Sequence, residues 1–218
     1  TLGTAANARL AIEPNEHFHL EELVAYELGY RHQLTPNLSL DVATFYNDYQ
    51  HLMTTSIQTP RLVINKIDPI HIFIPVQFTN KMQGKTRGAE IAGHWSATEN
   101  MKLTVNYSYL HLQLEAQEAS QKTAGLLYPR HQAGLAFFYN PGNNWTLDTT
   151  VTYVSQLAIA PSYIRWDLNL GKQLGKNLRI NIVGENIGDS AHPEFGSATD
   201  INYGEIERSV FARVTWQF

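Results

Sequence analysis

Hydrophobic and polar residues alternate along most of this chain with the two-residue period of a β-strand. In the last strand of the sequence, Val210, Ala212, Val214, Trp216 and Phe218 share one face, and mostly polar residues occupy the other. The same alternation, bounded by turn residues, predicts about nine strands and no helix. These strands cover residues 21–34, 38–54, 70–96 (with an interruption), 101–114, 129–140, 145–156, 162–174, 178–187 and 206–218.

The connections between the expected strands alternate in length. Tight turns rich in Pro, Asn and Gly are expected near residues 35–37, 98–100, 141–144 and 175–177. Longer connections are expected near residues 55–69, 115–128 and 188–205, and only the 157–161 link is short on that side. Outer-membrane barrels have tight periplasmic turns and long outer loops. The alternation therefore favours a transmembrane β-barrel over a soluble β-sandwich, in which the aromatic residues would pack a core.

Composition is compatible with this interpretation and excludes other classes. The 218 residues are 43% hydrophobic and 17% charged, with a mean hydropathy of −0.28. No run reaches the roughly 18 to 20 apolar residues that a membrane helix needs. The chain has no cysteine, which excludes a disulfide framework and zinc–thiolate sites. Its net charge of −4 argues against a nucleic-acid partner, which would call for a basic stripe. Because the sequence begins at Thr1, we expect a processed chain or a fragment, and we favour a fragment.

The polar face of the expected strands carries charges of both signs next to small residues. Mixed charges of this kind need water or partners. The small residues leave the lumen unfilled, which points to a wide barrel with room for a separate plug. Nine strands would also leave open edges, so the chain is expected to be part of a larger wall. The polar residues expected to face the lumen or plug are Glu27, Arg31, Asp41, Glu90, Asp167, Arg179 and Arg213, with His94, Asn106, Asp148, Arg165 and Glu185 on the same side.

Several motifs, taken in order, resemble the C-terminal part of the barrel of TonB-dependent outer-membrane receptors. Residues 22–31 resemble the family's "E…YELGYR" strand, and residues 38–49 the following strand with its Tyr-rich end. Asn80 with residues 88–91, the stretch 103–110, residues 177–188 and residues 207–218 are similar to later strands of the same barrel. Each motif is weak alone, but their order and spacing make the resemblance specific over nearly the whole chain.

The resemblance implies an all-β fold, an antiparallel up-and-down transmembrane barrel. The chain would supply about the last nine of 22 strands, without the plug domain. Residues 1–218 would form one portion of the barrel, with 1–20 as an outer loop. The whole receptor would import a scarce nutrient, most simply a ferric siderophore or similar metal complex. It would lie in the bacterial outer membrane, and its partners would be lipid, its own plug, the TonB complex and the assembly machinery. No cofactor is implied.

Two groups of residues are candidates for specific roles. Phe218, Trp216 and Val214 match the C-terminal aromatic strand that serves outer-membrane proteins as an assembly signal, although lipid anchorage alone would also explain them. His17, His19 and His192 lie in expected outer loops and are weak candidates for ligand binding. A solvated polar loop is the main alternative for His17 and His19. Packing between loops is an equal alternative for His192.

Other functional classes remain as alternatives. An enzyme would need a nucleophile with a base in reach, but Ser108 and His111 project to opposite strand faces. We therefore expect no catalytic residues and no metal site. A passive porin-like channel would need no energy supply, and a soluble ligand-binding barrel would behave well without detergent. The sequence does not name the imported ligand.

Overall fold

A computed structural model describes residues 7–64, 69–116, 128–158, 160–195 and 204–218. The described residues form β-strands joined by turns, and no helix among them is long and apolar enough to cross a membrane. The strands are β1 (Asn7–Ile12), β2 (Glu22–Thr35), β3 (Leu38–Ile57), β4 (Arg61–Val63), β5 (His71–Thr98), β6 (Met101–Ala116), β7 (His131–Gly142), β8 (Trp145–Val154), β9 (Tyr163–Leu174), β10 (Leu178–Glu185), β11 (Ala191–Phe195), β12 (Gly204–Glu207) and β13 (Ser209–Trp216).

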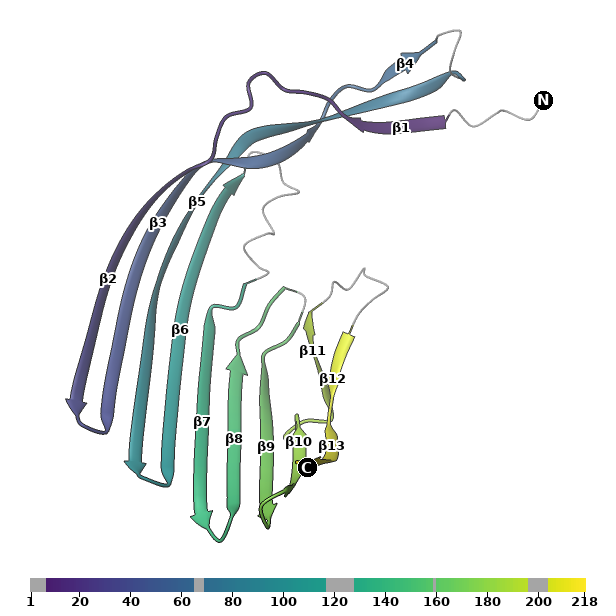
Figure 1. Cartoon of the computed structure of the whole chain (residues 1–218). Helices are drawn as coiled ribbons and strands as arrows, with labels where there is room; N and C mark the ends of the chain where they lie inside the picture. The colour runs from purple at the N-terminus through teal and green to yellow at the C-terminus, as the bar shows by residue number, and fades with distance from the viewer. Residues whose placement is uncertain (1–6, 65–68, 117–127, 159, 196–203) are drawn as a thin grey trace. The chain divides into compact units, whose positions relative to one another are not determined.

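The main sheet has the strand order β13-β10-β9-β8-β7-β6-β5-β3-β2 (Figure 1). The tight turns of its hairpins lie at one end, as expected for an up-and-down wall. Among the described residues, the end strands β2 and β13 do not pair with one another, so the sheet is open. The all-β, antiparallel fold predicted from the alternation is confirmed, and so is its partial character.

The chain forms two compact units. One unit contains residues 26–46, 86–112 and 125–218, which include the β7–β13 strands. The other contains residues 1–25, 47–85 and 113–124. In this second unit, β5 pairs in parallel with β1 along one edge and antiparallel with β4 along the other. β1 therefore occupies part of the segment expected to be an outer loop.

Three strand predictions were wrong in detail. β5 is continuous from His71 to Thr98, although an interruption was expected. Its proline, Pro75, lies opposite Ala11 of β1, and its carbonyl accepts a hydrogen bond from the Gln58 N–H. The last expected strand is divided into β12 and β13 at Arg208, whose N–H bonds to the Ser190 carbonyl. The expected 188–205 connection contains β11.

Apolar side chains do not converge in a core. Among the described residues, only Val154 and Ala160 are buried hydrophobic residues. Cross-strand register instead places apolar residues side by side on one face of the sheet, as in the Val105–Leu135–Val151–Trp166 row. This face is open, with Ile164 56% and Val214 64% exposed. The structure therefore contradicts a soluble β-sandwich, whose apolar side chains would pack against one another.

Candidate functional site on the polar face

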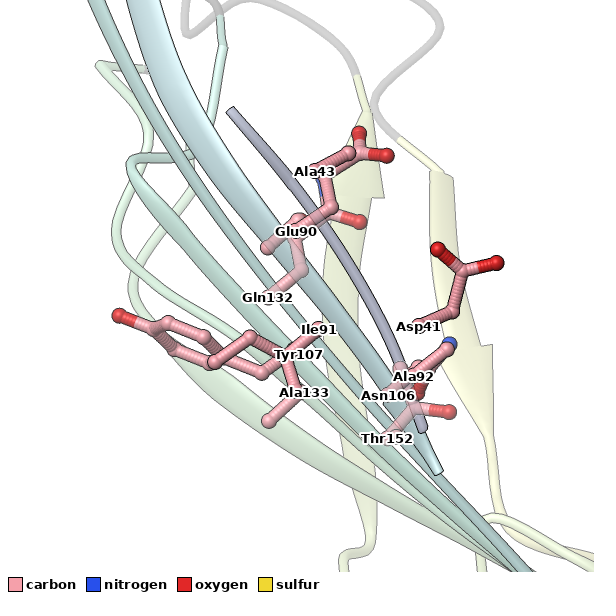
Figure 2. Close-up of a pocket in the computed structure, with 12 residues that line it drawn as sticks. Asp41, Ala43, Glu90, Ile91, Ala92, Asn106, Tyr107, Gln132, Ala133 and Thr152 are labelled. Carbon is pink, nitrogen blue, oxygen red and sulfur yellow. The ribbon is translucent and has the colours of Figure 1, made fainter. Parts of the chain in front are cut away.

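The polar face of the sheet contains a hollow of about 470 Å³. Five neighbouring strands line it, from β3 to β8, and it lies within one compact unit. Figure 2 shows Asp41, Asn106 and Thr152 on one side of the sheet and Tyr107 directed to the other side. The polar side chains of the lining are Asp41, Glu90, Asn106, Ser108, Gln132 and Thr152. Carboxylate, amide and hydroxyl groups of this kind can hydrogen-bond a polar partner.

Small residues make room for this hollow. Ala43, Ala92 and Gly134 belong to its lining. A Cβ atom on Gly134 would collide with Oδ1 of Asn106, which lies directly opposite on β6. Glycine is therefore needed at this position for the Asn106 amide to lie against the β7 backbone. That this face lines the unfilled lumen of a wide barrel stays a prediction.

The two carboxylates of the hollow differ in their partners. Asp41 pairs with Arg31 of β2, whose Nε lies 2.7 Å from Asp41 Oδ2. Glu90 has no hydrogen-bond or ion-pair partner among the described residues. The Arg31 side chain is 83% exposed, so its pair with Asp41 contributes little to stability. The hollow thus presents one compensated and one uncompensated negative charge.

A chain of hydrogen bonds links the polar faces of β8, β9 and β10. Asn181 Nδ2 donates to Asn169 Oδ1 at 2.8 Å, and Asn169 Nδ2 donates to Asp148 Oδ2 at 3.1 Å. Arg179 Nη2 donates to Thr146 Oγ1 at 3.0 Å. Arg213 of β13 lies opposite Asn181 in the strand register. The predicted polar-face residues Arg179 and Arg213 therefore share one side with this network.

A second charged cluster surrounds the first residues of β9. Arg165 pairs with Asp167 at 3.0 Å and lies 3.8 Å from Glu194 of β11. Asp167 Oδ1 also accepts a hydrogen bond from the Asn186 N–H at 2.9 Å. These contacts fasten the connection after β10 to the polar face of β9. Glu27, by contrast, is exposed on β2, at the far end of the strand order from β8, β9 and β10.

His192 is part of the same connection and is buried, with 4% exposure. Its ring stacks on Tyr163 with centroids 4.3 Å apart, and its Nε2 lies 3.2 Å from Glu194 Oε1. The described contacts are those of a packing residue. A ligand-binding role for His192 stays a prediction.

His17 and His19 lie in the other compact unit and are exposed. The His17 N–H bonds to Asn15 Oδ1 at 3.0 Å. The backbone of His19 is held by Asn80, whose Oδ1 accepts from the His19 N–H at 2.7 Å and whose Nδ2 donates to the His19 carbonyl at 3.0 Å. No group of three or more potential metal ligands occurs within the described part of the chain. A ligand role for these two side chains remains a prediction.

The proposed assembly residues lie at the free edge of the sheet. Val214 and Trp216 are on the apolar face of β13, with exposed fractions of 64% and 65%. β13 ends at Trp216, and Phe218 follows it as a fully exposed residue. Asn177 holds this end, because its Nδ2 donates to the Gln217 carbonyl at 2.6 Å and its own carbonyl accepts the Gln217 N–H.

Sequence reasoning missed two asparagines that organise the sites. Asn186 is completely buried, has a positive φ of 50°, and donates through Nδ2 to the Ile206 carbonyl at 2.9 Å. Asn80 joins three segments, since it also donates to the His51 carbonyl. The only sequence signal for Asn186 is the Glu-Asn-Ile-Gly string after an apolar strand, which is typical of a turn with a left-handed residue.

The family is established by comparison. Residues 5–187 match the family model described as TonB dependent receptor-like, beta-barrel. The match covers most of the chain, and the chain therefore belongs to this family, as the order of its strand motifs indicated.

Solved structures of receptors and transporters have the same fold. The siderophore receptor PirA from Acinetobacter baumannii superposes with a TM-score of 0.72 at 14% identity, covering 95% of this chain and 33% of that one. A variant of the ferric enterobactin receptor PfeA from Pseudomonas aeruginosa, in complex with enterobactin, gives 0.70 at 16% identity, covering 96% and 33%. The copper transporter OprC gives 0.63 at 15% identity, covering 92% and 32%. The chain spans about a third of the length of these proteins.

Proposed function

We propose that this chain forms part of the barrel wall of an outer-membrane receptor that takes up a scarce nutrient by an energy-dependent route. The observation that carries the proposal is the two-sided sheet of a TonB-dependent receptor barrel, apolar and open on one face, polar and hollowed on the other. An apolar face without a core suits contact with lipid. The polar face suits an aqueous lumen that holds a plug.

A ferric siderophore or similar metal complex is the proposed substrate. The similar structures are those of a siderophore receptor, a ferric enterobactin receptor and a copper transporter. Their common element is a metal ion or metal complex, and their identity to this chain is low. The proposal is therefore made for the substrate class and for no individual compound.

The lumen-facing residues are proposed to contact the plug domain. Glu90 is the leading candidate, because it lines the hollow and has no partner among the described residues. Asp41 and Arg31 now pair with each other, and each would give up some of these contacts to bind groups of the plug. The other members of the proposed plug-facing set are Glu27, Asp167, Arg179 and Arg213.

Uptake measurements on the complete receptor test this function. The receptor would be expressed in cells that lack their own siderophore receptors, and radioactive iron uptake would be followed with a panel of ferric siderophores. We expect uptake of at least one complex, saturable with concentration, and abolished in cells without TonB. Uptake that is equal with and without TonB would indicate a passive channel and would overturn the proposal. A variant with a disrupted TonB-contacting segment is the matched control.

A further inference from the structure

One charged side chain lies on the otherwise apolar face of strands β7, β8, β9, β10 and β13. Lys172 of β9 is directly opposite Trp145 of β8 on one side and Ile180 of β10 on the other. Residues directly opposite in neighbouring strands share a face. Among the described residues of β7, β8, β9, β10 and β13, Lys172 is the only Lys, Arg, Asp or Glu on this face. A charge on a lipid-facing surface is unfavourable at the middle of the membrane and much less so near its interfaces, so the depth of Lys172 decides what it can contact.

The lysine is held in a defined position at the tight-turn end of the sheet. Its Nζ lies 4.6 Å from the centre of the Trp145 ring and donates a hydrogen bond to the Asn143 carbonyl at 2.6 Å. Asn143 belongs to the turn between β7 and β8 and has a positive φ of 50°. The amine is therefore placed by the indole ring and the turn, at the level where the strands end.

The held amine still has binding capacity. A lysine ammonium has three N–H donors, and the Asn143 carbonyl uses one of them. Trp145 is 40% exposed beside it, and Lys176 lies exposed in the turn between β9 and β10. Aromatic and basic residues at the end of a lipid-facing surface lie at the depth of lipid headgroups. The two remaining donors suit the phosphate oxygens of a headgroup, and the indole suits the glycerol region below it.

We propose that Lys172 and Trp145 form a binding site for the headgroup phosphate of a phospholipid, in the leaflet next to the tight turns. This inference rests on the assignment of the apolar face to lipid made under the proposed function, but not on the transported substrate. Asn143 orients the amine, and Lys176 adds positive charge at the rim of the site. A phospholipid would also lay its acyl chains on the neighbouring apolar face. A free phosphate ion has no acyl chains and would lack this contact.

Native mass spectrometry of the complete, detergent-purified receptor tests the site. Phosphatidylglycerol is the probe, and digalactosyldiacylglycerol is the phosphate-free control lipid. We expect Lys172→Gln to weaken phosphatidylglycerol binding about five- to tenfold, because a charge-assisted contact is lost at a partly exposed site. Lys172→Arg should keep most of the binding. Lys102→Gln is the matched control, because Lys102 lies opposite Phe138 on the polar face near a tight turn.

Three results would overturn the inference. These are equal binding of the two lipids by the unmodified receptor, equal loss in the Lys172→Gln and Lys102→Gln variants, and displacement of phosphatidylglycerol by millimolar inorganic phosphate. The Lys172→Gln change removes a charge from the lipid-facing surface, so folding should be retained, and heat-modifiable gel migration checks this. Iron uptake by the same variant should be unchanged. Failure of the lipid site is therefore distinguishable from failure of the import function.

Discussion

A pair of adjacent substitutions on β8 tests which face of the sheet meets lipid. Val151 lies on the apolar face between Leu135 and Trp166, whereas Thr150 lies on the polar face between Ala136 and Asp167. Both positions can be changed to lysine. The two variants then have the same charge and nearly the same depth, and they differ only in the face that carries the charge.

The depth follows from strand geometry. Val151 is six residues beyond Trp145, which begins β8 at the tight-turn end. At about 3.3 Å per residue and a tilt of about 40°, six residues rise about 15 Å. The apolar band of an outer-membrane barrel is about 25 Å tall, so Val151 lies within a few Å of its middle. Thr150 lies one residue lower.

The expected difference is large. A lysine at the middle of the lipid face costs about 2–4 kcal/mol, which corresponds to about a 30- to 900-fold change in the folding equilibrium. Val151→Lys should lose this amount. Thr150→Lys should change stability by less than about 0.5 kcal/mol, since it meets water and the Asp167 carboxylate across the strand pair.

Urea unfolding of the complete receptor in lipid vesicles measures this difference, with heat-modifiable gel migration as the readout. Equal losses in the Val151→Lys and Thr150→Lys variants would refute the assignment of faces. A larger loss for Thr150→Lys would mean that the polar face is the dry one.

Three further changes test the polar contacts. A double-mutant cycle of Arg31→Gln and Asp41→Asn should give a coupling of less than about 1 kcal/mol, measured by urea unfolding, because the arginine is largely exposed. Gly134→Val should displace the Asn106 side chain and cost less than about 1 kcal/mol in the same assay, because only that exposed side chain has to move, and Asn106→Ala should remove the cost. Asn186→Ala should destabilise by about 1–3 kcal/mol through the positive φ and the lost Ile206 contact; equal stability of the Ala and Gly variants would contradict the backbone part of this explanation.

The strands were predictable because alternation and turn residues are local signals. β6, β8 and β9 begin at or within one residue of the expected positions, where Asn-containing turns or Pro161 precede them. The small residues on the polar face were predictable for the same reason. Side chains alternate between the two faces of a strand, so the face of Gly134 and Gly171 follows once the face of one neighbour in the strand is assigned.

Other parts of the structure depend on partners far away in the sequence. Pro75 looks like a strand breaker when read locally, but it lies within β5, opposite Ala11, which is more than sixty residues earlier in the chain. Asn80 looks like an ordinary polar residue, but it holds the backbones of His19 and His51. To predict such contacts, one must know the register between strands that are distant in the sequence. Hydrophobic periodicity does not determine this register.

The absence of a core within the described residues determines where specificity can lie in this wall. In the proposed membrane orientation, apolar positions all along the sheet would make the same kind of contact with lipid, so their exchange among apolar residues should change little. The polar face is different, because each hydrogen bond there depends on a particular neighbour and on glycines that leave room for it. Selection for a ligand or plug can act on the hollow around Glu90, and selection for a lipid can act on Lys172. These two sites lie on opposite faces, so changes at one should leave the other intact.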